Sequence, residues 1–432
     1  MSKWIHTTLN DICCSEKNAI ISGPFGSNIS KKFFVAEGVP VIRGNNLSLS
    51  LDKFYDDGFV FVTQAKADEL NCYAVEGDLL FTAAGTIGQV GILEAPLKYS
   101  KYVISNKQLR ARIDISKVDR YYAFFWFASP WMQDYFINNN KGSTVPLITL
   151  SELKDAPITY PIDIVEQQKI VTVIEAISQK IEVNRKICTE LEAMAKTLYD
   201  YWFTQFDFPD DEGRPYRSSG GEMVWNEQLK REIPRGWTAK GLGEVCTFRN
   251  GINYDKDCIG NRVYRIANVR NITASSLIMD VSDFDEISLP REQADRYVIR
   301  ENDIIIARSG TPGATRLIID PADNVIFCGF IICCTPNDFR QRLFLTHFLK
   351  QLEGTNATKT GGSILQNVSQ DTLKSLLVCF PNDVVVDSFN EKIKPIVEMM
   401  QSIIIENREL IKLRDWLLPM LMNGQAKVEG GE

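Results

Sequence analysis

The most constraining feature of this sequence is that its motifs occur twice in the same order, in units of roughly 200 residues. The sharpest match is an apolar run that begins with an aspartate and leads to a glycine turn: Asp78 with Gly85, Thr86 and Gly88, and Asp303 with Gly310, Thr311 and Gly313. Each copy has the pattern of a strand that ends in a tight turn. The repeat therefore predicts two similar globular domains.

Further matches extend the repeat along the chain. Near the start of each copy, Trp4, Leu9 and Ile12 correspond to Trp237, Leu242 and Val245. Residues 41–47 then align with 263–269, which sets Arg43 against Arg265 and Asn46 against Asn268. Near the end of each copy, Gly142, Leu153 and Pro161 correspond to Gly362, Leu373 and Pro381. The intervening loops differ, and Lys31 and Lys32 have no evident counterpart. A shared scaffold with different loops suits the recognition of two different targets.

Each copy ends in a long helical pattern with apolar residues spaced by four and three, which is a heptad stripe. The positions expected to pair are Ile174, Ile181, Asn184 and Leu191 in the first stripe and Val397, Ile404, Asn407 and Ile411 in the second. The asparagine falls at the same place in both stripes, which favours pairing of the two helices over separate packing of each on its own domain. A helix of about 32 residues would be about 48 Å long. Pro395 and Pro419 are expected to bound or bend the second helix.

These patterns predict an α+β fold with two similar globular domains of mixed and antiparallel sheet, suited to target recognition. The domains would be separated by two long helices that pair as an antiparallel coiled coil, with an approximate two-fold axis. The expected boundaries are 1–162 for the first domain, 163–206 for the central helix, 207–236 for a polar connector, 237–383 for the second domain and 384–424 for the C-terminal helix.

The composition is that of an ordinary globular protein, with 44% hydrophobic and 24% charged residues. The net charge of −7 argues mildly against a stand-alone, nonspecific nucleic-acid binder, which is usually basic. No apolar run is long enough to span a membrane, and no secretion signal precedes the first domain, so a cytoplasmic location is expected. The ten cysteines contain no C-x-x-C spacing and are best explained as reduced thiols.

No complete catalytic signature is present. Residues 354–360 lack the second glycine of a phosphate-binding loop, and Gly85, Gly88 and Gly91 have the wrong spacing for a dinucleotide site. Ala307 removes the nucleophile-elbow pattern around Ser309, and the signature of amino-methyltransferases is absent. With only two histidines, His-based catalysis or zinc binding is disfavoured as well. The chain is expected to have no catalytic residue, metal site or cofactor of its own.

Polar residues suited to nucleic acid instead gather in the predicted loops. Arginine or lysine can donate two hydrogen bonds to guanine, and asparagine can form two with adenine, whereas hydroxyl groups reach phosphates. The candidates for DNA contact are Lys31, Lys32, Arg43, Asn45, Asn46, Thr86, Lys141, Ser143, Arg262, Arg265, Asn268, Arg270, Arg308, Thr311, Lys359 and Ser363. A single residue is weak evidence, since Arg43 or Arg265 could equally form a structural ion pair, so the clusters carry more weight.

The sequence as a whole resembles the specificity subunit of type I restriction–modification systems. The resemblance is carried by residues 23–27 (GPFGS), 39–43 (VPVIR), 77–80 (GDLL), 166–170 (EQQKI), 206–209 (FDFP), 218–221 (SSGG) and 233–237 (IPRGW). Their order, the duplication and the paired helical patterns together make the match.

The resemblance implies a division of labour. Each domain would read one half of a split, asymmetric site on double-stranded DNA, and the helices would set the unread gap. Two modification subunits would methylate an adenine in each half with S-adenosylmethionine, and a motor-nuclease subunit would supply the chemistry that needs ATP and Mg²⁺. One residue departs from the family pattern: Arg414 stands where the second stripe would have an apolar residue. It is expected either to be solvated at the edge of the helix pair or to face a partner subunit.

Two other functions remain open from the sequence. A structural adaptor would use the paired helices to hold proteins together without DNA, and a gel shift with random duplex would separate it from a DNA reader. A self-contained nuclease or methyltransferase with an unfamiliar site would transfer a labelled cofactor group without partners.

Overall fold

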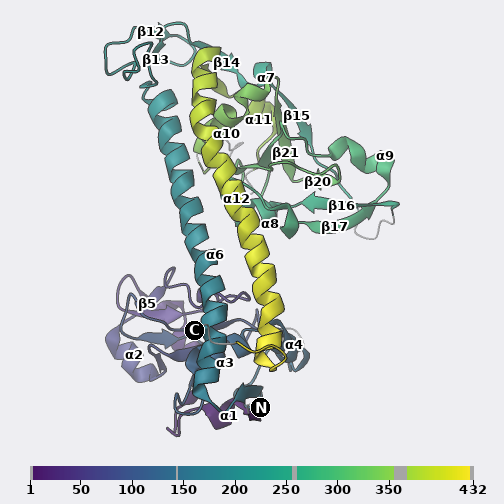
Figure 1. Ribbon diagram of the computed structural model, residues 1–432. Helices are drawn as coiled ribbons and strands as arrows, with labels where there is room; N and C mark the ends of the chain where they lie inside the picture. Colours follow the sequence, from purple (N-terminus) through teal and green to yellow (C-terminus); the bar gives the residue numbers. More distant parts are fainter. Residues whose placement is uncertain (1–2, 143–144, 255–259, 355–366, 429–432) are drawn as a thin grey trace. The chain divides into compact units, whose positions relative to one another are not determined.

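The computed structural model describes residues 3–142, 145–254, 260–354 and 367–428. The chain forms two compact units, one of Met1–Glu182 with Glu409–Glu432 and the other of Val183–Arg408. Each unit holds one sheet-bearing domain and part of both long helices, α6 (Ile164–Tyr199) and α12 (Asp383–Met422), as can be followed in Figure 1. Among the described residues, no helix is both long and apolar enough to cross a membrane.

The first domain contains a four-stranded antiparallel sheet and a five-stranded mixed sheet. The first sheet has the order β2 (Ile20–Ser22), β10 (Gln108–Arg112), β7 (Asp78–Thr82) and β8 (Val90–Ile92). The second has the order β3 (Phe34–Val35), β5 (Val60–Val62), β4 (Val39–Ile42), β9 (Tyr102–Ile104) and β6 (Tyr73–Ala74), in which β4 and β9 are parallel. A separate pair joins β1 (Trp4–Thr8) to β11 (Pro157–Pro161). The helices are α1 (Leu9–Ile12), α2 (Gln64–Leu70), α3 (Arg120–Phe127), α4 (Pro130–Asn138) and α5 (Leu150–Lys154).

The second domain repeats the order of the four-stranded sheet, and its mixed sheet has three strands among the described residues in place of five. Its four-stranded sheet has the order β15 (Cys246–Asn250), β21 (Ile331–Pro336), β18 (Ile304–Ala307) and β19 (Thr315–Leu317). A mixed sheet follows, with β17 (Asp285–Leu289), β16 (Arg262–Ala267) and β20 (Val325–Phe327), and a pair joins β14 (Thr238–Gly241) to β22 (Leu377–Phe380). The helices are α7 (Leu242–Val245), α8 (Val269–Ala274), α9 (Arg291–Ala294), α10 (Arg342–Gln351) and α11 (Gln370–Lys374). The predicted α+β class with two similar domains is confirmed.

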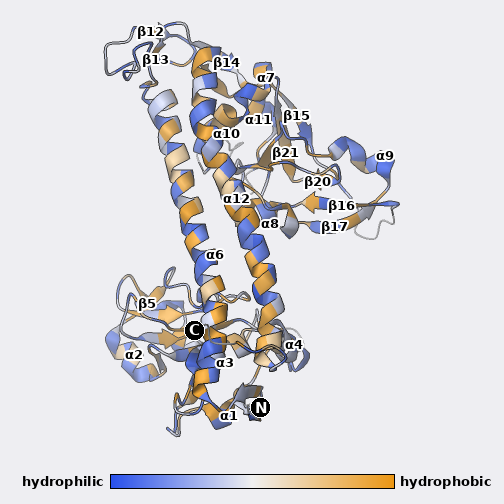
Figure 2. Ribbon diagram, in the orientation of Figure 1, coloured by the Kyte–Doolittle hydropathy of each residue, from blue (hydrophilic) through white to orange (hydrophobic). Residues whose placement is uncertain are grey.

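Apolar sequence decides which elements form the cores. In the first domain α3 has almost no polar residue, and its buried Phe127 ring meets Phe81 of β7 at 5.7 Å in an edge-to-face contact. In the second, Phe344 of α10 packs at 4.7 Å against Phe203, which lies in a π-helical turn (Asp200–Thr204) after α6. Apolar and polar residues alternate along both long helices (Figure 2), as expected for helices with one buried stripe.

The two long helices run antiparallel where the second unit holds them both. Asn184 contacts Asn407, and the Cys188 thiol lies 3.9 Å from the Met400 carbonyl oxygen, so the numbers rise along α6 as they fall along α12. In the first unit Ile174 of α6 shares a core with Leu418 of α12. Of the stripe, Ile174, Ile181, Asn184, Leu191 and Val397 are buried, whereas Ile404 and Ile411 are half-buried.

The structure adds three details on the helices and the connector. Neither Pro395 nor Pro419 ends α12, which continues through both, because packing of its apolar face outweighs the loss of single backbone hydrogen bonds. Arg414 is buried and pairs with Asp415, so it is not a solvated edge residue. Segment 207–236 contains a hairpin of β12 (Met223–Asn226) and β13 (Arg231–Pro234), and its Phe208 stacks on Trp237 at 5.1 Å.

Candidate nucleic-acid interface

Backbone hydrogen bonds define which loop positions are equivalent in the two domains. In the first domain β4 ends at Ile42, whose carbonyl accepts from the N–H of Ser105, the residue after β9, at 3.0 Å. In the second domain β16 ends at Ala267, whose carbonyl accepts from the N–H of Cys328, the residue after β20, at 3.1 Å. Ile42 and Ala267 therefore occupy the same place. The loop that follows starts at Arg43 in the first domain and at Asn268 in the second.

A buried asparagine clamps each of these loops into the same turn. Its side-chain oxygen accepts from the backbone N–H three residues earlier, at 2.9 Å for Asn46 with Arg43 and at 2.8 Å for Asn271 with Asn268. Its amide group donates to a later carbonyl, at 2.8 Å from Asn46 to Asp57 and at 2.9 Å from Asn271 to Asp283. Both asparagines are at most 5% exposed. The turn is thus held from inside by a residue with all of its polar atoms engaged.

This register corrects the alignment made from sequence. Arg43 is equivalent to Asn268 rather than to Arg265, and Asn46 is equivalent to Asn271 rather than to Asn268. The sequence match was wrong by three residues, because an apolar strand with an arginine can be aligned without gaps in more than one register, and strand pairing decides between them. Asn46 is fully buried, so it supports the loop and does not present its side chain at the surface.

The side chains that point outward from each turn converge on one acceptor. In the first domain Arg43 and Asn45 lie 3.4 and 3.5 Å from the carbonyl oxygen of Gly58. In the second, Asn268 donates to the Asp285 carboxylate at 3.0 Å, and Arg270 forms an ion pair with the same carboxylate. Asn45 and Arg270 are exposed, and Arg43 and Asn268 are half-buried.

The glycine turns after β7 and β18 are equivalent, as the sequence predicted. Gly85 and Gly88 have φ of +98° and +90°, and Gly310 and Gly313 have φ of +78° and +85°, a conformation that favours glycine. Thr86 and Thr311 are exposed at the two tips. Arg308 is exposed and precedes the glycine turn of the second domain. Its counterpart in the first domain is Ala83, because the Ala83 N–H donates to the carbonyl of Lys107, just before β10, and the Arg308 N–H donates to the carbonyl of Phe330, just before β21.

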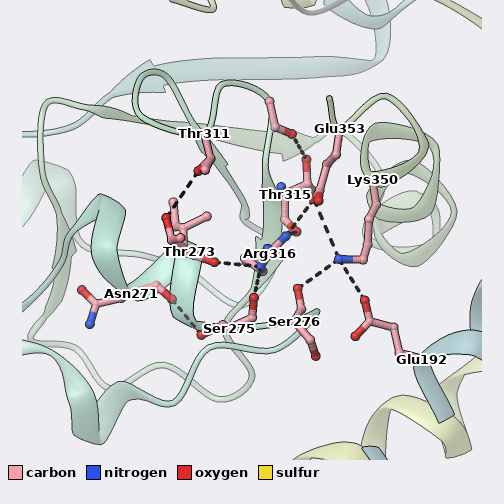
Figure 3. A network of polar contacts seen from close by, with 12 residues as sticks. Glu192, Asn271, Thr273, Ser275, Ser276, Thr311, Thr315, Arg316, Lys350 and Glu353 are labelled. Atoms are coloured by element: carbon pink, nitrogen blue, oxygen red, sulfur yellow. Dashed lines mark hydrogen bonds and ion pairs between the residues drawn. The ribbon is translucent and has the colours of Figure 1, made fainter. Parts of the chain in front are cut away.

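A polar network holds the end of α8, the short helix that follows Asn268 and contains Arg270 and Asn271 (Figure 3). The buried guanidinium of Arg316 on β19 donates to the carbonyls of Ile272 at 3.1 Å and Ser275 at 2.8 Å, which close α8. It also pairs with Glu353 at 2.7 Å. Lys350 continues the network to Glu192 of α6 at 3.0 Å and to the Ser276 carbonyl at 3.0 Å.

In the first domain, apolar packing takes the place of this polar network. Strand pairing sets Gly91 opposite Leu80 as it sets Arg316 opposite Ile305, so Gly91 is the counterpart of Arg316. A Cβ at Gly91 would lie 2.6 Å from the Leu47 side chain, which occupies this space. Sequence reasoning missed Arg316; its only signal was a single arginine in the short apolar strand around it.

Acidic groups surround the clamped turn that follows β16. Burial, with the charge of Asp280 as the next cause, raises the pKa of Asp283 above its usual value. Asp285 and Glu286 lie on the strand beside the turn, where they meet Arg270 and Arg265. This group of carboxylates would repel an anion such as a phosphate.

The remaining candidates are spread over several surfaces. Arg262 and Arg265 lie on β16 and pair with carboxylates, at 2.9 Å to Asp323 and 3.4 Å to Glu286. Lys31 and Lys32 are exposed in a short 3-10 turn, and Lys141 is 69% exposed and 3.9 Å from Glu152. Ser143, Lys359 and Ser363 lie outside the described residues. In the part of the chain that is described, no group of three or more His, Cys, Asp or Glu residues could hold a metal ion.

Comparison with known proteins agrees with this arrangement. A family model described as the type I restriction modification DNA specificity domain matches residues 1–193 and 234–413. The type I restriction enzyme MjaIX specificity subunit of Methanocaldococcus jannaschii is 28% identical over 361 residues, 82% of this chain and 78% of that protein. The HindI specificity subunit of Haemophilus influenzae is 24% identical over 406 residues, 81% and 86% of the two chains.

A solved structure shows the same fold. The S subunit of a type I restriction–modification system from M. genitalium matches with a TM-score of 0.53 at 14% identity, over 98% of this chain and 96% of that one. The family model covers far more than half of the residues, in two segments that each contain one of the two domains. This chain therefore belongs to the family of type I restriction modification DNA specificity proteins.

Proposed function

We propose that this chain reads a bipartite, asymmetric site on double-stranded DNA, with one domain for each half-site. The observation that carries the proposal is the pair of equivalent turns after β4 and β16. Their backbones are clamped in the same way by Asn46 and Asn271, while the residues that face outward differ. Two identical frames with different side chains are what two different half-sites require.

The contacts follow from the chemistry of the exposed groups. Arg43, Asn45, Asn268 and Arg270 have donors and acceptors for base edges in the major groove. Lys31, Lys32, Lys141 and Arg308 would neutralise phosphates, and the hydroxyls of Thr86 and Thr311 would donate to them. The net charge of −7 is compatible with a DNA reader whose basic contacts are local, or with one whose affinity is shared with partner subunits.

The chemistry itself would come from partners. Relatives are named as specificity subunits of restriction enzymes, which supports a complex in which other chains act on the DNA. In the proposed complex, two methyltransferase subunits bind S-adenosylmethionine and modify an adenine in each half-site, and a motor-nuclease subunit uses ATP and Mg²⁺. This chain would be non-catalytic, would bind no cofactor, and would act in the cytoplasm with the genomic DNA.

The two long helices would fix the distance between the half-sites. Their antiparallel packing in the second unit and their shared core in the first support a rigid connection. A stiff spacer defines a single gap, whereas a flexible linker would tolerate many gaps.

A genome-wide map of methylated adenines tests the proposal, in cells with the gene intact and deleted. The expected result is that one split motif with a fixed gap loses methylation on deletion. If methylation partners are active and no motif depends on the gene, the chain is not a DNA reader, and an adaptor role of the long helices takes its place.

A further inference from the structure

We propose that the outward pair of each clamped turn decides base identity: Arg43 and Asn45 in the first half-site, Asn268 and Arg270 in the second. Each turn would read one guanine through its arginine and one adenine through its asparagine, and the order of the two would be reversed between the domains. This inference rests on the proposed function and adds to it the positions and the base classes.

The geometry of the turns carries the inference. The first outward position is Arg43 or Asn268, and the second is Asn45 or Arg270, two residues later in both domains. In each domain the pair meets at one acceptor, the Gly58 carbonyl or the Asp285 carboxylate. Two side chains that share an acceptor lie next to each other, which is the arrangement needed to address neighbouring base edges.

The side chains keep donors for a ligand. Within the described residues, the Arg43 guanidinium donates only through Nη2, so its Nη1 group is the one that can bind a ligand, since Nε is buried. Arg270 bonds Asp285 through Nη2 alone and is 62% exposed. A guanidinium needs two N–H groups to bind guanine N7 and O6, and each arginine has them.

The surroundings favour bases over phosphates. The Asp285 carboxylate stands at the centre of the second pair, and Asp283 and Glu286 are close to it in sequence. A phosphate at this place would be repelled as an anion by the carboxylates, whereas a base edge carries no net charge and would be repelled much less. The clamp by Asn46 or Asn271 also points to base reading, because base contacts demand accurate placement and phosphate contacts tolerate flexible side chains.

An exchange of the two side chains within one turn tests the inference. In cells with the partner subunits, the gene is replaced by the variant N268R/R270N or by R43N/N45R, and methylated adenines are mapped. The first variant is expected to change bases in one half-site and the second variant in the other, with the gap and the untouched half-site retained. The untouched half-site proves that the chain is folded and assembled. R291N, at an exposed arginine of α9, is the matched control and is expected to keep the wild-type motif.

Single conservative variants cover the case in which an exchange abolishes methylation. R270K keeps the charge and loses the two-bond geometry, so preference for guanine at one position of its half-site is expected to fall about tenfold or more. The result that overturns the inference is an unchanged motif in both exchange variants, or full discrimination in R270K when the exchange is inactive. Either result leaves the proposed function intact, because that function fails only if no motif depends on the wild-type gene.

Discussion

Asn184 of α6 donates a hydrogen bond from its side-chain nitrogen to the side-chain oxygen of Asn407 of α12 at 2.8 Å. The same Asn184 amide lies 2.8 Å from the Glu406 carboxylate. Asn184 is 1% exposed, so this polar contact lies inside an otherwise apolar stripe. A buried polar pair of this kind satisfies itself only in one alignment of the two helices, and therefore selects that register.

Replacement of one asparagine is expected to destabilise the helix pair. N184L removes the donor at a buried position, and we expect the free energy of unfolding to fall by about 1–3 kcal/mol. N184L/N407L makes both positions apolar and should recover most of this loss. Denaturant unfolding followed by circular dichroism measures both. A single variant as stable as the wild type would show that the contact does not contribute.

Arg316 is expected to matter for stability and for one half-site only. R316M leaves the carbonyls of Ile272 and Ser275 without their donor and removes one partner of Glu353, which keeps the Thr315 N–H at 2.6 Å and Lys350 at 3.8 Å. We expect the free energy of unfolding to fall by about 2–3 kcal/mol. This is less than for a fully buried ion pair, because Glu353 is 27% exposed. Denaturant unfolding measures this loss.

The same variant has a second readout in DNA binding. Because Arg316 closes α8, mismatches in the half-site of the second domain should be tolerated better by R316M, while those in the other half-site should still abolish binding. Competition binding with mismatched duplexes checks this. Equal relaxation at both half-sites would contradict the assigned role.

His347 is expected to make the protein sensitive to mild acid. The ring is 3% exposed between aromatic side chains, and burial, followed by the charge of Lys350, lowers its pKa from 6.5 to about 4. Below pH 6.5 the unfolded chain binds a proton here that the native chain does not bind until about pH 4. The free energy of unfolding should therefore fall as the pH drops from 6.5 to 4, by about 3 kcal/mol in total.

The variant H347F removes this contribution and isolates it from the carboxylates, which also titrate in this range. We expect its stability to decline less steeply between pH 6.5 and 4 than that of the wild type. H6Q replaces the other histidine, which is exposed, and serves as the control. Parallel stability profiles for H347F and the wild type would refute the prediction.

Exchange of a whole domain is expected to change one half-site. When residues 237–383 are replaced by the matching domain of a relative with a different target, the new motif should combine the retained half-site with the relative's half-site at an unchanged gap. Methylation mapping or selection of bound duplexes provides the measurement. A motif altered on both sides would show that the domains do not read independently.

Local patterns in the sequence predicted most of the scaffold. The glycine turns at Gly85 and Gly310 could be found because positive φ requires glycine there, and the two long helices because a heptad stripe is visible without any tertiary information. The position of the asparagine in each stripe predicted the contact between Asn184 and Asn407. The hairpin at 223–234 was not predicted, since its polar sequence resembles a loop and its strands pair only with each other.

What the sequence determined by itself is the duplicated α+β architecture, because repeats, turn residues and helical periodicity are properties of neighbours along the chain. Only the tertiary structure decided which side chains face outward from the two turns clamped by Asn46 and Asn271. Strand pairing between β4 and β9, and between β16 and β20, set Arg43 against Asn268 and buried Asn46 and Asn271. Such pairing joins residues about 60 positions apart, and a slip in register moves a side chain from one face to the other, so no local pattern could define it.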